Sequence, residues 1–228
     1  MSTLSNVETR RGEANPSSIR LAPDAYPEAK SSKTGESVRY VPDPNKHWYV
    51  FRASRGREDK AFDFMVEDGT FCYIGKRYER KIIRGKERKI LRALIPNLVF
   101  AFTTEEQAEK YVKRTPSLSF LTYYYNHFEK DDIDGSKNPP LIVPIREMEK
   151  FIITTNKHNE HLRFIEESQC HYKSGDIVRV VDGEFKGVEG RVARVAGQQR
   201  VVISLANIGL ISTAYIPKAF LQSLDNID

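Results

Sequence analysis

Residues 76–102, KRYERKIIRGKERKILRALIPNLVFAF, decide the fold because a basic segment and an apolar segment meet there. The basic segment carries nine Lys and Arg residues against two Glu, a local net charge of +7. The whole chain carries +5, so the remaining residues sum to −2. Ile82-Ile83 and Ile90-Leu91 flank the turn-like Arg84-Gly85-Lys86, which predicts a β-hairpin leading into a strand that ends at Phe102.

The apolar segment after the hairpin is interrupted only by Pro96-Asn97, residues that fix or tolerate special backbone angles at the entrance to a strand. A basic hairpin beside an apolar strand suggests one surface for nucleic acid and one for a protein partner. A second interpretation stays open, because Lys-rich hairpins also serve as solvated elements that protect a sheet edge from aggregation.

Length and composition limit the protein class. At 228 residues the chain is long enough for one large domain or two small ones. A pI of about 9.1, together with the clustered charge, indicates a polyanionic partner. Cys72 and Cys170 make no disulfide framework, which favours a reducing cytosol. No stretch resembles a signal peptide or the roughly 20 apolar residues of a membrane span, so we expect a soluble, cytoplasmic protein without a membrane partner.

Residues 1–46 are rich in Ser, Pro, Glu and Asn and show no sustained apolar period. Such a segment buries too little apolar surface to offset the entropy of ordering it, which predicts a disordered tail. Ile19, Leu21 and Tyr26 are the residues of this tail with the chemistry to dock elsewhere.

Residues 47–156 predict an α+β unit with helices packed over an antiparallel sheet. Strands are expected at residues 47–53, 71–74 and 118–125 and in the apolar segment. Helices are expected at residues 58–68, from the capping box Thr104–Gln107 to Pro116, and after Pro144. In the strand at 118–125, three successive tyrosines alternate between faces, so at least one should be exposed.

Two polar stretches raise the question of metal binding. Asp131–Gly135 lacks the spacing and the closing Glu of a calcium loop and is predicted to be an ordinary loop. Residues 157–172 are predicted to be a linker, and their histidines and cysteine match no standard zinc spacing. We therefore expect no metal and no cofactor, with a metal-dependent regulator built on His158, His161, Cys170 and His171 as a minor alternative.

Residues 173–228 alternate apolar and polar side chains in short segments with glycine at the corners, which predicts a small all-β barrel. The chain carries no glycine-rich phosphate loop, no nucleophile elbow and no histidine beside a plausible nucleophile in the sequence. We therefore expect a binding protein rather than an enzyme.

Two stretches match known patterns. Residues 175–180 and 184–192 resemble a KOW motif, which is typical of an SH3-like barrel. Trp48-Tyr49-Val50, the apolar segment 94–100 and Thr115-Pro116 resemble the NusG N-terminal domain. Together, over about residues 46–224, they resemble NusG-type transcription elongation factors. Arg84-Gly85-Lys86 and Pro96-Asn97 are similar to the RfaH type, and the long hairpin and Ala214-Tyr215-Ile216-Pro217 to UpxY-type antiterminators of surface-polysaccharide operons.

The resemblance implies a protein that binds RNA polymerase and suppresses pausing or termination. In this family the apolar strand docks on the clamp helices of the largest polymerase subunit. The positions implied here are Tyr49, Ile95, Leu98 and Phe100, and the docking requires that part of this strand is left uncovered. The alternative is that these four residues are simply core.

The resemblance also implies contacts to the non-template DNA strand from the first turn, and the basic hairpin is placed to reach upstream DNA or nascent RNA. Phosphate contacts of this kind position a protein without specifying a sequence. The implied nucleic-acid-binding residues are Arg55, Arg57, Lys76, Arg77, Arg80, Lys81, Arg84, Lys86, Arg88 and Lys89.

The barrel of NusG proteins recruits a termination factor or a ribosomal protein, and either is an implied partner here. The alternative function is a general RNA- or ribosome-binding KOW protein, which predicts affinity for free RNA with a steep salt dependence.

Overall fold

The computed structural model describes residues 21–126, 138–166 and 170–224, with only the backbone described at residues 171–175. The predicted loop Asp131–Gly135 and the first 20 residues of the predicted tail lie outside the described residues. Within the described part of the chain, no helix is both long and apolar enough to span a membrane.

The described residues form a mixed, sheet-rich fold, consistent with the predicted α+β class. The α-helices are α1 (Glu58–Glu67), α2 (Glu105–Glu109) with its π-helical continuation η2 (Lys110–Arg114), and α3 (Ile145–Thr155). Short 3₁₀ turns are η1 (Pro23–Ala25), η3 (Pro116–Leu118) and η5 (Lys218–Phe220). The helices begin and end close to the expected positions, and the Thr104 hydroxyl accepts the Gln107 N–H at 3.3 Å, as the capping box predicts.

A five-stranded antiparallel sheet forms the centre of the first unit. Its order is β4-β7-β3-β8, and a fifth strand, β9, also pairs with β3. The strands are β3 (His47–Ala53), β4 (Phe71–Tyr73), β7 (Leu98–Thr103), β8 (Leu121–Tyr123) and β9 (Ile142–Val143). Two separate two-stranded sheets accompany it: β1 (Ala29–Lys30) with β2 (Ser37–Val38), and β5 (Lys76–Ile83) with β6 (Lys86–Ala93).

The second unit is a six-stranded antiparallel sheet in the order β10-β14-β13-β12-β11-β15. Its strands are β10 (Arg163–Ile165), β11 (His171–Val180), β12 (Glu189–Val195), β13 (Gln198–Leu205), β14 (Gly209–Tyr215) and β15 (Leu221–Ser223). Within the described residues β10 and β15 end the sheet without pairing to each other, so a closed barrel is not seen. β10 lies in the predicted linker and was not expected. Its three residues form a strand because they pair with β14, which is distant in the sequence.

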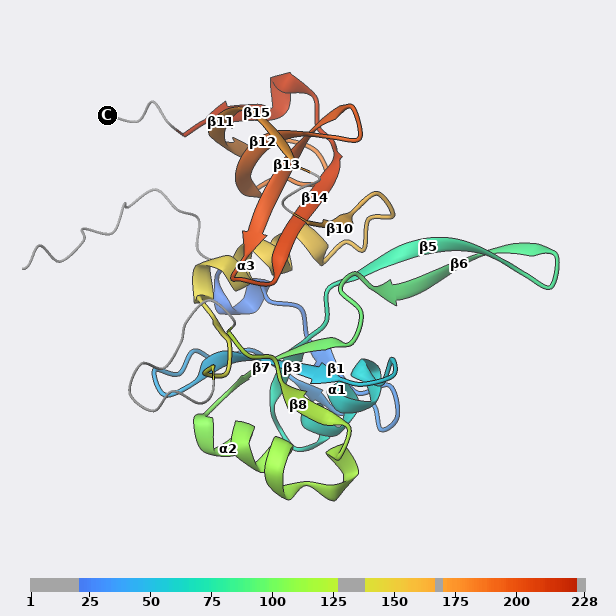
Figure 1. The fold of residues 1–228 in the computed structure, drawn as a ribbon, viewed down its shortest axis with the longest axis vertical. Helices are drawn as coiled ribbons and strands as arrows, with labels where there is room; N and C mark the ends of the chain where they lie inside the picture. Colours follow the sequence, from blue (N-terminus) through green and yellow to red (C-terminus); the bar gives the residue numbers. More distant parts are fainter. Residues whose placement is uncertain (1–20, 127–137, 167–169, 225–228) are drawn as a thin grey trace, which may run out of the picture.

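Both faces of the five-stranded sheet are covered (Figure 1). On one face, Met65 of α1 contacts Cys72 of β4 at 3.7 Å, and Tyr111 of η2 is fully buried nearby. On the other face, Phe151 of α3 packs against Phe100 of β7, with ring centroids 5.3 Å apart. Every residue of β7 is therefore buried.

The N-terminal residues described also cover the sheet. Tyr26 and Tyr40 stack at 3.8 Å, and Tyr40 packs against Trp48 of β3. The Tyr26 hydroxyl donates to Glu149 of α3 at 3.1 Å, and the Ser32 hydroxyl donates to Asp63 of α1 at 2.7 Å. The predicted disordered tail is therefore wrong for residues 21–46, because scattered tyrosines and serines find partners on α1, α3 and β3 that composition does not show.

Gly75 marks the point where the β5–β6 hairpin leaves the sheet. A Cβ atom at this position would lie 2.4 Å from Cζ of Phe151, so only glycine allows the ring of α3 to pack this closely. The Gly75 carbonyl also accepts the Leu94 N–H at 2.8 Å, which closes the base of the hairpin.

The second unit packs on α3. The Ala206 N–H donates to the Glu147 carboxylate at 2.5 Å, and Lys150 lies 3.8 Å from Glu189 of β12. Buried residues of both sheets belong to one continuous apolar cluster, so α3 is shared by the two units.

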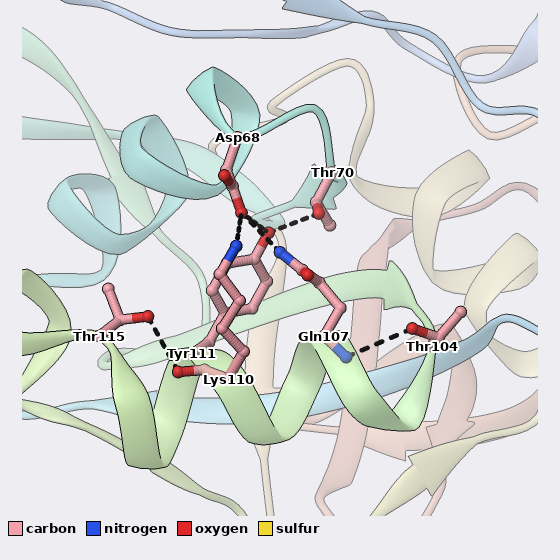
Figure 2. Close-up of polar contacts among 7 residues, drawn as sticks. All are labelled: Asp68, Thr70, Thr104, Gln107, Lys110, Tyr111 and Thr115. Atoms are coloured by element: carbon pink, nitrogen blue, oxygen red, sulfur yellow. Dashed lines mark hydrogen bonds and ion pairs between the residues drawn. The ribbon is translucent and has the colours of Figure 1, made fainter.

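A polar cluster joins the end of α1 to α2 and η2 (Figure 2). The Asp68 carboxylate, at the C-cap of α1, accepts hydrogen bonds from Gln107 at 2.5 Å, Tyr111 at 3.1 Å and Lys110 at 3.3 Å. The Tyr111 hydroxyl also lies 2.6 Å from the Thr70 hydroxyl, so this buried phenol is fully paired. Burial is the main cause that raises the pKa of Tyr111 above its ordinary range.

We expect Asp68→Ala to lower the free energy of unfolding by about 1–3 kcal/mol, because it removes the shared acceptor of Gln107, Lys110 and Tyr111 and leaves the buried Tyr111 hydroxyl paired with Thr70. Urea unfolding followed by circular dichroism measures this loss. Asp176→Ala is the control, since Asp176 is exposed and makes no hydrogen bond or ion pair within the described residues. Equal stability of the two variants would contradict a structural role for the cluster.

Candidate nucleic-acid interface

The β5–β6 hairpin projects from the rest of the molecule (Figure 1). Its strands pair without a register shift from Lys76↔Ala93 to Ile83↔Lys86. Arg84 and Gly85 form a two-residue turn with φ of 52° and 73°. Positive φ at both positions is the signature of the type I′ turn, which matches the twist of the strands. The predicted hairpin and turn are confirmed.

Like charges face each other across the hairpin. The register places Arg77 opposite Arg92, Arg80 opposite Lys89, and Lys81 opposite Arg88. Directly opposed like charges destabilise a strand pair, and an exposed two-stranded ribbon has little packing to compensate. The arrangement therefore favours a polyanionic ligand, whose charge would remove the repulsion.

Carboxylates pair with three of the cations at the base of the hairpin. Lys76 lies 2.6 Å from Asp59 of α1, and Arg92 lies 3.7 Å from Glu79. Arg80 lies 3.2 Å from Glu160, and this hydrogen bond is the main cause that lowers the pKa of Glu160. Because that folded-state pKa is lowered, the pair stabilises the protein above the ordinary glutamate range and loses this contribution as the pH falls through the lowered value.

The distal half of the hairpin keeps its charge. Within the described residues, four exposed cations there have no ion pair: Lys81, Arg84, Lys86 and Arg88. Ile82 beside them is 78 % exposed. Lys89 lies between the two halves, with its ammonium 4.6 Å from the centre of the Tyr78 ring. The hairpin is thus anchored by ion pairs at its base and presents uncompensated cations at its tip.

The turn before α1 presents two further predicted residues. Arg55 is exposed and has a left-handed backbone with φ of 62°. Arg57 donates to the Ser54 carbonyl at 2.9 Å, and its guanidinium stacks 4.1 Å from the Phe120 ring centre. Asp59 follows in α1 and pairs with Lys76, so this turn lies close to the base of the hairpin.

The four residues implied for polymerase docking do not form an open surface. Tyr49, Ile95, Leu98 and Phe100 are 4 %, 6 %, 3 % and 1 % exposed. Phe100 is covered by Phe151 of α3, and Tyr49 packs toward Phe51 and Tyr123 on the opposite face. The expectation that the apolar strand is partly uncovered is wrong, because helices and the N-terminal residues close both faces.

The accessible residues near Tyr49 lie on the sheet edge formed by β8 and β9. Ile142 pairs with Tyr49 and is 43 % exposed. Tyr125 is 39 % exposed and packs edge-on against Tyr123, with ring centroids 6.1 Å apart. This confirms that at least one of the three successive tyrosines is exposed.

Neither metal-binding nor thiol chemistry has support among the residues that the structure describes. No group of three His, Cys, Asp or Glu side chains is placed there to hold a metal ion. His158 instead packs edge-on against Tyr78 at the base of the hairpin. Cys72 is enclosed by the core, and this burial raises its thiol pKa, which keeps the unreactive protonated form.

Comparison with known protein families found a match to the first unit. Residues 46–152 match the family model described as transcription termination factor nusG. A search of curated proteins found no match. The matched range contains the five-stranded sheet and the basic hairpin, and β10–β15 lie beyond it. The match agrees with the resemblance of the first unit to the NusG N-terminal domain.

We expect Arg84→Asn to stabilise the hairpin and to weaken nucleic-acid binding. Asn adopts the left-handed turn more readily than Arg, but the substitution removes a charge from the tip. Hydrogen exchange of the hairpin amides should slow, while the affinity for DNA should fall. Arg84→Lys, which keeps both the charge and the strain, should change neither property. DNA affinity that is unaltered in Arg84→Asn would contradict a contact at the tip.

We expect Phe100→Ala to lower the free energy of unfolding by about 3–5 kcal/mol, because the ring is core that packs on Phe151. Urea unfolding measures this loss. Ile142→Ala on the exposed edge should cost clearly less. A Phe100→Ala variant with wild-type stability would show that the ring does not act as core.

Proposed function

We propose that this chain, which carries a NusG-family domain over residues 46–152, is a transcription elongation factor that suppresses pausing and termination by holding DNA beside RNA polymerase. The observation that carries the proposal is the set of uncompensated cations at the tip of the β5–β6 hairpin. In the proposal these cations contact phosphates of the displaced non-template strand or of upstream duplex DNA.

The topology argues against a hairpin that only protects a sheet edge. β5 and β6 form a sheet of their own and pair with no strand of the five-stranded sheet. The ribbon therefore shields no edge of that sheet. A purely solubilising ribbon also has no need for like charges in opposed positions, since mixed charges solvate it without the repulsion.

The polymerase contact in this proposal lies on the β8–β9 edge. Tyr125 and Ile142 are exposed there and continue the aromatic group that contains Tyr49 and Tyr123. An exposed aromatic and aliphatic edge suits the tip of a helical coiled coil such as the clamp helices of the largest polymerase subunit. The second unit, as a KOW module, would recruit a ribosomal protein or a termination factor.

The more specific assignment rests on sequence resemblance. Arg84-Gly85-Lys86 and Pro96-Asn97 support a specialised antiterminator of the RfaH type. The long hairpin, the segment from Pro139 to Phe151 and the Ala214-Tyr215-Ile216-Pro217 ending support the UpxY type, which acts on polysaccharide operons. A general RNA- or ribosome-binding protein is the alternative function, and it predicts tighter binding to free RNA than to DNA.

We expect the double variant Lys81→Gln/Arg88→Gln to bind DNA more weakly and to lose pause suppression while still binding RNA polymerase. Log Kobs falls with log salt concentration, and for duplex DNA each lost phosphate contact reduces the magnitude of that slope by about 0.9. Loss of two contacts should therefore reduce it by about 1.8. Fluorescence anisotropy with labelled DNA and RNA, a pull-down of core polymerase and a pausing assay supply the measurements.

The double variant Lys30→Gln/Lys33→Gln is the control. It removes the same charge from the exposed hairpin formed by β1 and β2. The salt slope of its DNA binding should stay unchanged. An unchanged slope for the Lys81/Arg88 variant would exclude the hairpin as the DNA contact, and preferential binding of free RNA would favour the alternative function.

A further inference from the structure

Three arginines from distant parts of the sequence meet where the hairpin base approaches the second unit. Arg77 belongs to β5, Arg163 to β10 and Arg200 to β13. Arg77 Nη1 donates to the Leu162 carbonyl at 2.7 Å, and Arg163 Nη1 donates to the same oxygen at 2.9 Å. The two guanidinium groups are therefore direct neighbours.

Arg200 lies next to this pair. Its Nη1 donates to the Thr213 carbonyl at 2.9 Å and to the His161 carbonyl at 3.3 Å, and its Nη2 donates to Gln198. Its Nε is buried and has no hydrogen-bond partner within the described residues. Burial is the main cause that lowers the pKa of Arg77 and of Arg200, and the charge of Arg163 lowers both further, while the charge of Glu79 partly raises the pKa of Arg77.

Within the described part of the chain, no carboxylate lies within ion-pair distance of the three arginines. The two acidic residues closest to the site along the chain are engaged elsewhere, since Glu79 pairs with Arg92 and Glu160 pairs with Arg80. Guanidinium groups held together without a counter-ion repel one another, and partial burial strengthens the repulsion. A bound anion would remove this cost.

The site is open to a ligand. A cavity of about 400 Å³ is lined by both faces of the junction: Arg77, Tyr78, Glu79, Arg80, Glu160, His161 and Arg163. Within the described residues the hydrogen bonds of Arg77 and Arg163 use only Nη1, so Nε and Nη2 of both side chains remain available. That pair of donors fits two oxygens of a phosphate group in bidentate geometry.

We propose that Arg77 and Arg163 bind a phosphodiester group of the nucleic acid that lies along the β5–β6 hairpin, with Arg200 behind them as a supporting cation. This inference rests on the proposed function, since it extends the same nucleic-acid track. Lys81 follows Arg77 by four positions in β5, which is about 13 Å along the strand. The junction and the tip therefore contact different phosphates of one nucleic acid.

The proposal gives the second unit a role in binding. Arg163 and Arg200 belong to the six-stranded sheet, whereas Arg77 belongs to the hairpin. A phosphate held by Arg77 and Arg163 therefore joins the two units through the ligand. Because the contact is to the backbone, it carries no base preference, and DNA and RNA of the same form are both ligands.

The test is Arg163→Gln in the full chain, with duplex DNA, single-stranded DNA and single-stranded RNA of equal length as probes. The variant should bind at least one probe more weakly, and the magnitude of its salt slope for that probe should fall by about 0.9 for duplex DNA or about 0.7 for a single strand. The probe with the largest change identifies the nucleic acid that reaches the junction. The melting temperature should stay within the range of Arg146→Gln, a matched variant on the first turn of α3, where Arg146 is exposed and forms no ion pair with another described residue.

A second variant tests the electrostatic argument by removing a negative charge from the cavity instead of a positive one. Glu160→Gln removes one of the two carboxylates that line the cavity and should tighten binding, while Glu36→Gln, the same change between β1 and β2, should not. If Arg163→Gln lowers the melting temperature but keeps the full salt slope, Arg163 is only a structural residue and the inference is overturned.

The two proposals fail in different ways. A wild-type protein that binds none of the probes, or a Lys81/Arg88 variant that keeps its slope, overturns the proposed function. A wild-type protein that binds through the hairpin, while Arg163→Gln keeps the full slope, overturns only the phosphate site at the junction.

Discussion

The packing of Phe151 against Gly75 holds the parts of the molecule in place. The Phe151 ring fills the space that a Cβ atom at Gly75 would occupy, and it contacts Tyr73 and Phe100 of the sheet, with centroids 5.7 Å and 5.3 Å away. The hairpin therefore leaves the sheet at a fixed point under α3. Since α3 also carries the second unit through Glu147 and Lys150, one helix positions all the surfaces that the function needs.

The distribution of charge follows from this anchoring. A two-stranded ribbon is marginally stable alone, so its base requires the contacts of Lys76 with Asp59, of Arg80 with Glu160 and of the Tyr78 N–H with the His158 carbonyl. Those contacts compensate the charges of Lys76 and Arg80 at the base, whereas the cations at the tip have no ion pair within the described residues. The stability of the ribbon thus comes from one end, which allows the other end to keep repelling charges for a ligand.

Local patterns predicted much of the fold, because turns, caps and strand periods depend on neighbouring residues. Asn97 adopts the expected left-handed backbone, with φ of 65°, and the Arg84-Gly85 turn closes the hairpin as its sequence indicates. Burial of Leu98 and Phe100 was not predictable in this way, because the side chains that cover the strand come from α3 and the N-terminal residues. The cluster of Arg77, Arg163 and Arg200 was not predictable for the same reason. No sequence pattern near Arg163 or Arg200 indicates a site, and both meet Arg77 only through tertiary structure.

The sheet order limits how one protein can bridge a polymerase and DNA. The hairpin follows β4, which is one edge of the sheet, whereas Tyr125 follows β8, which is the other. Three strand spacings, about 14 Å, separate the two edges. Since β7 and β3 between them are covered on both faces, the proposed function places the protein partner at the β8–β9 edge and the nucleic acid at the hairpin, where the two do not compete. Occupation of both edges therefore needs no rearrangement of the core, and the rigid sheet sets the distance between the two ligands.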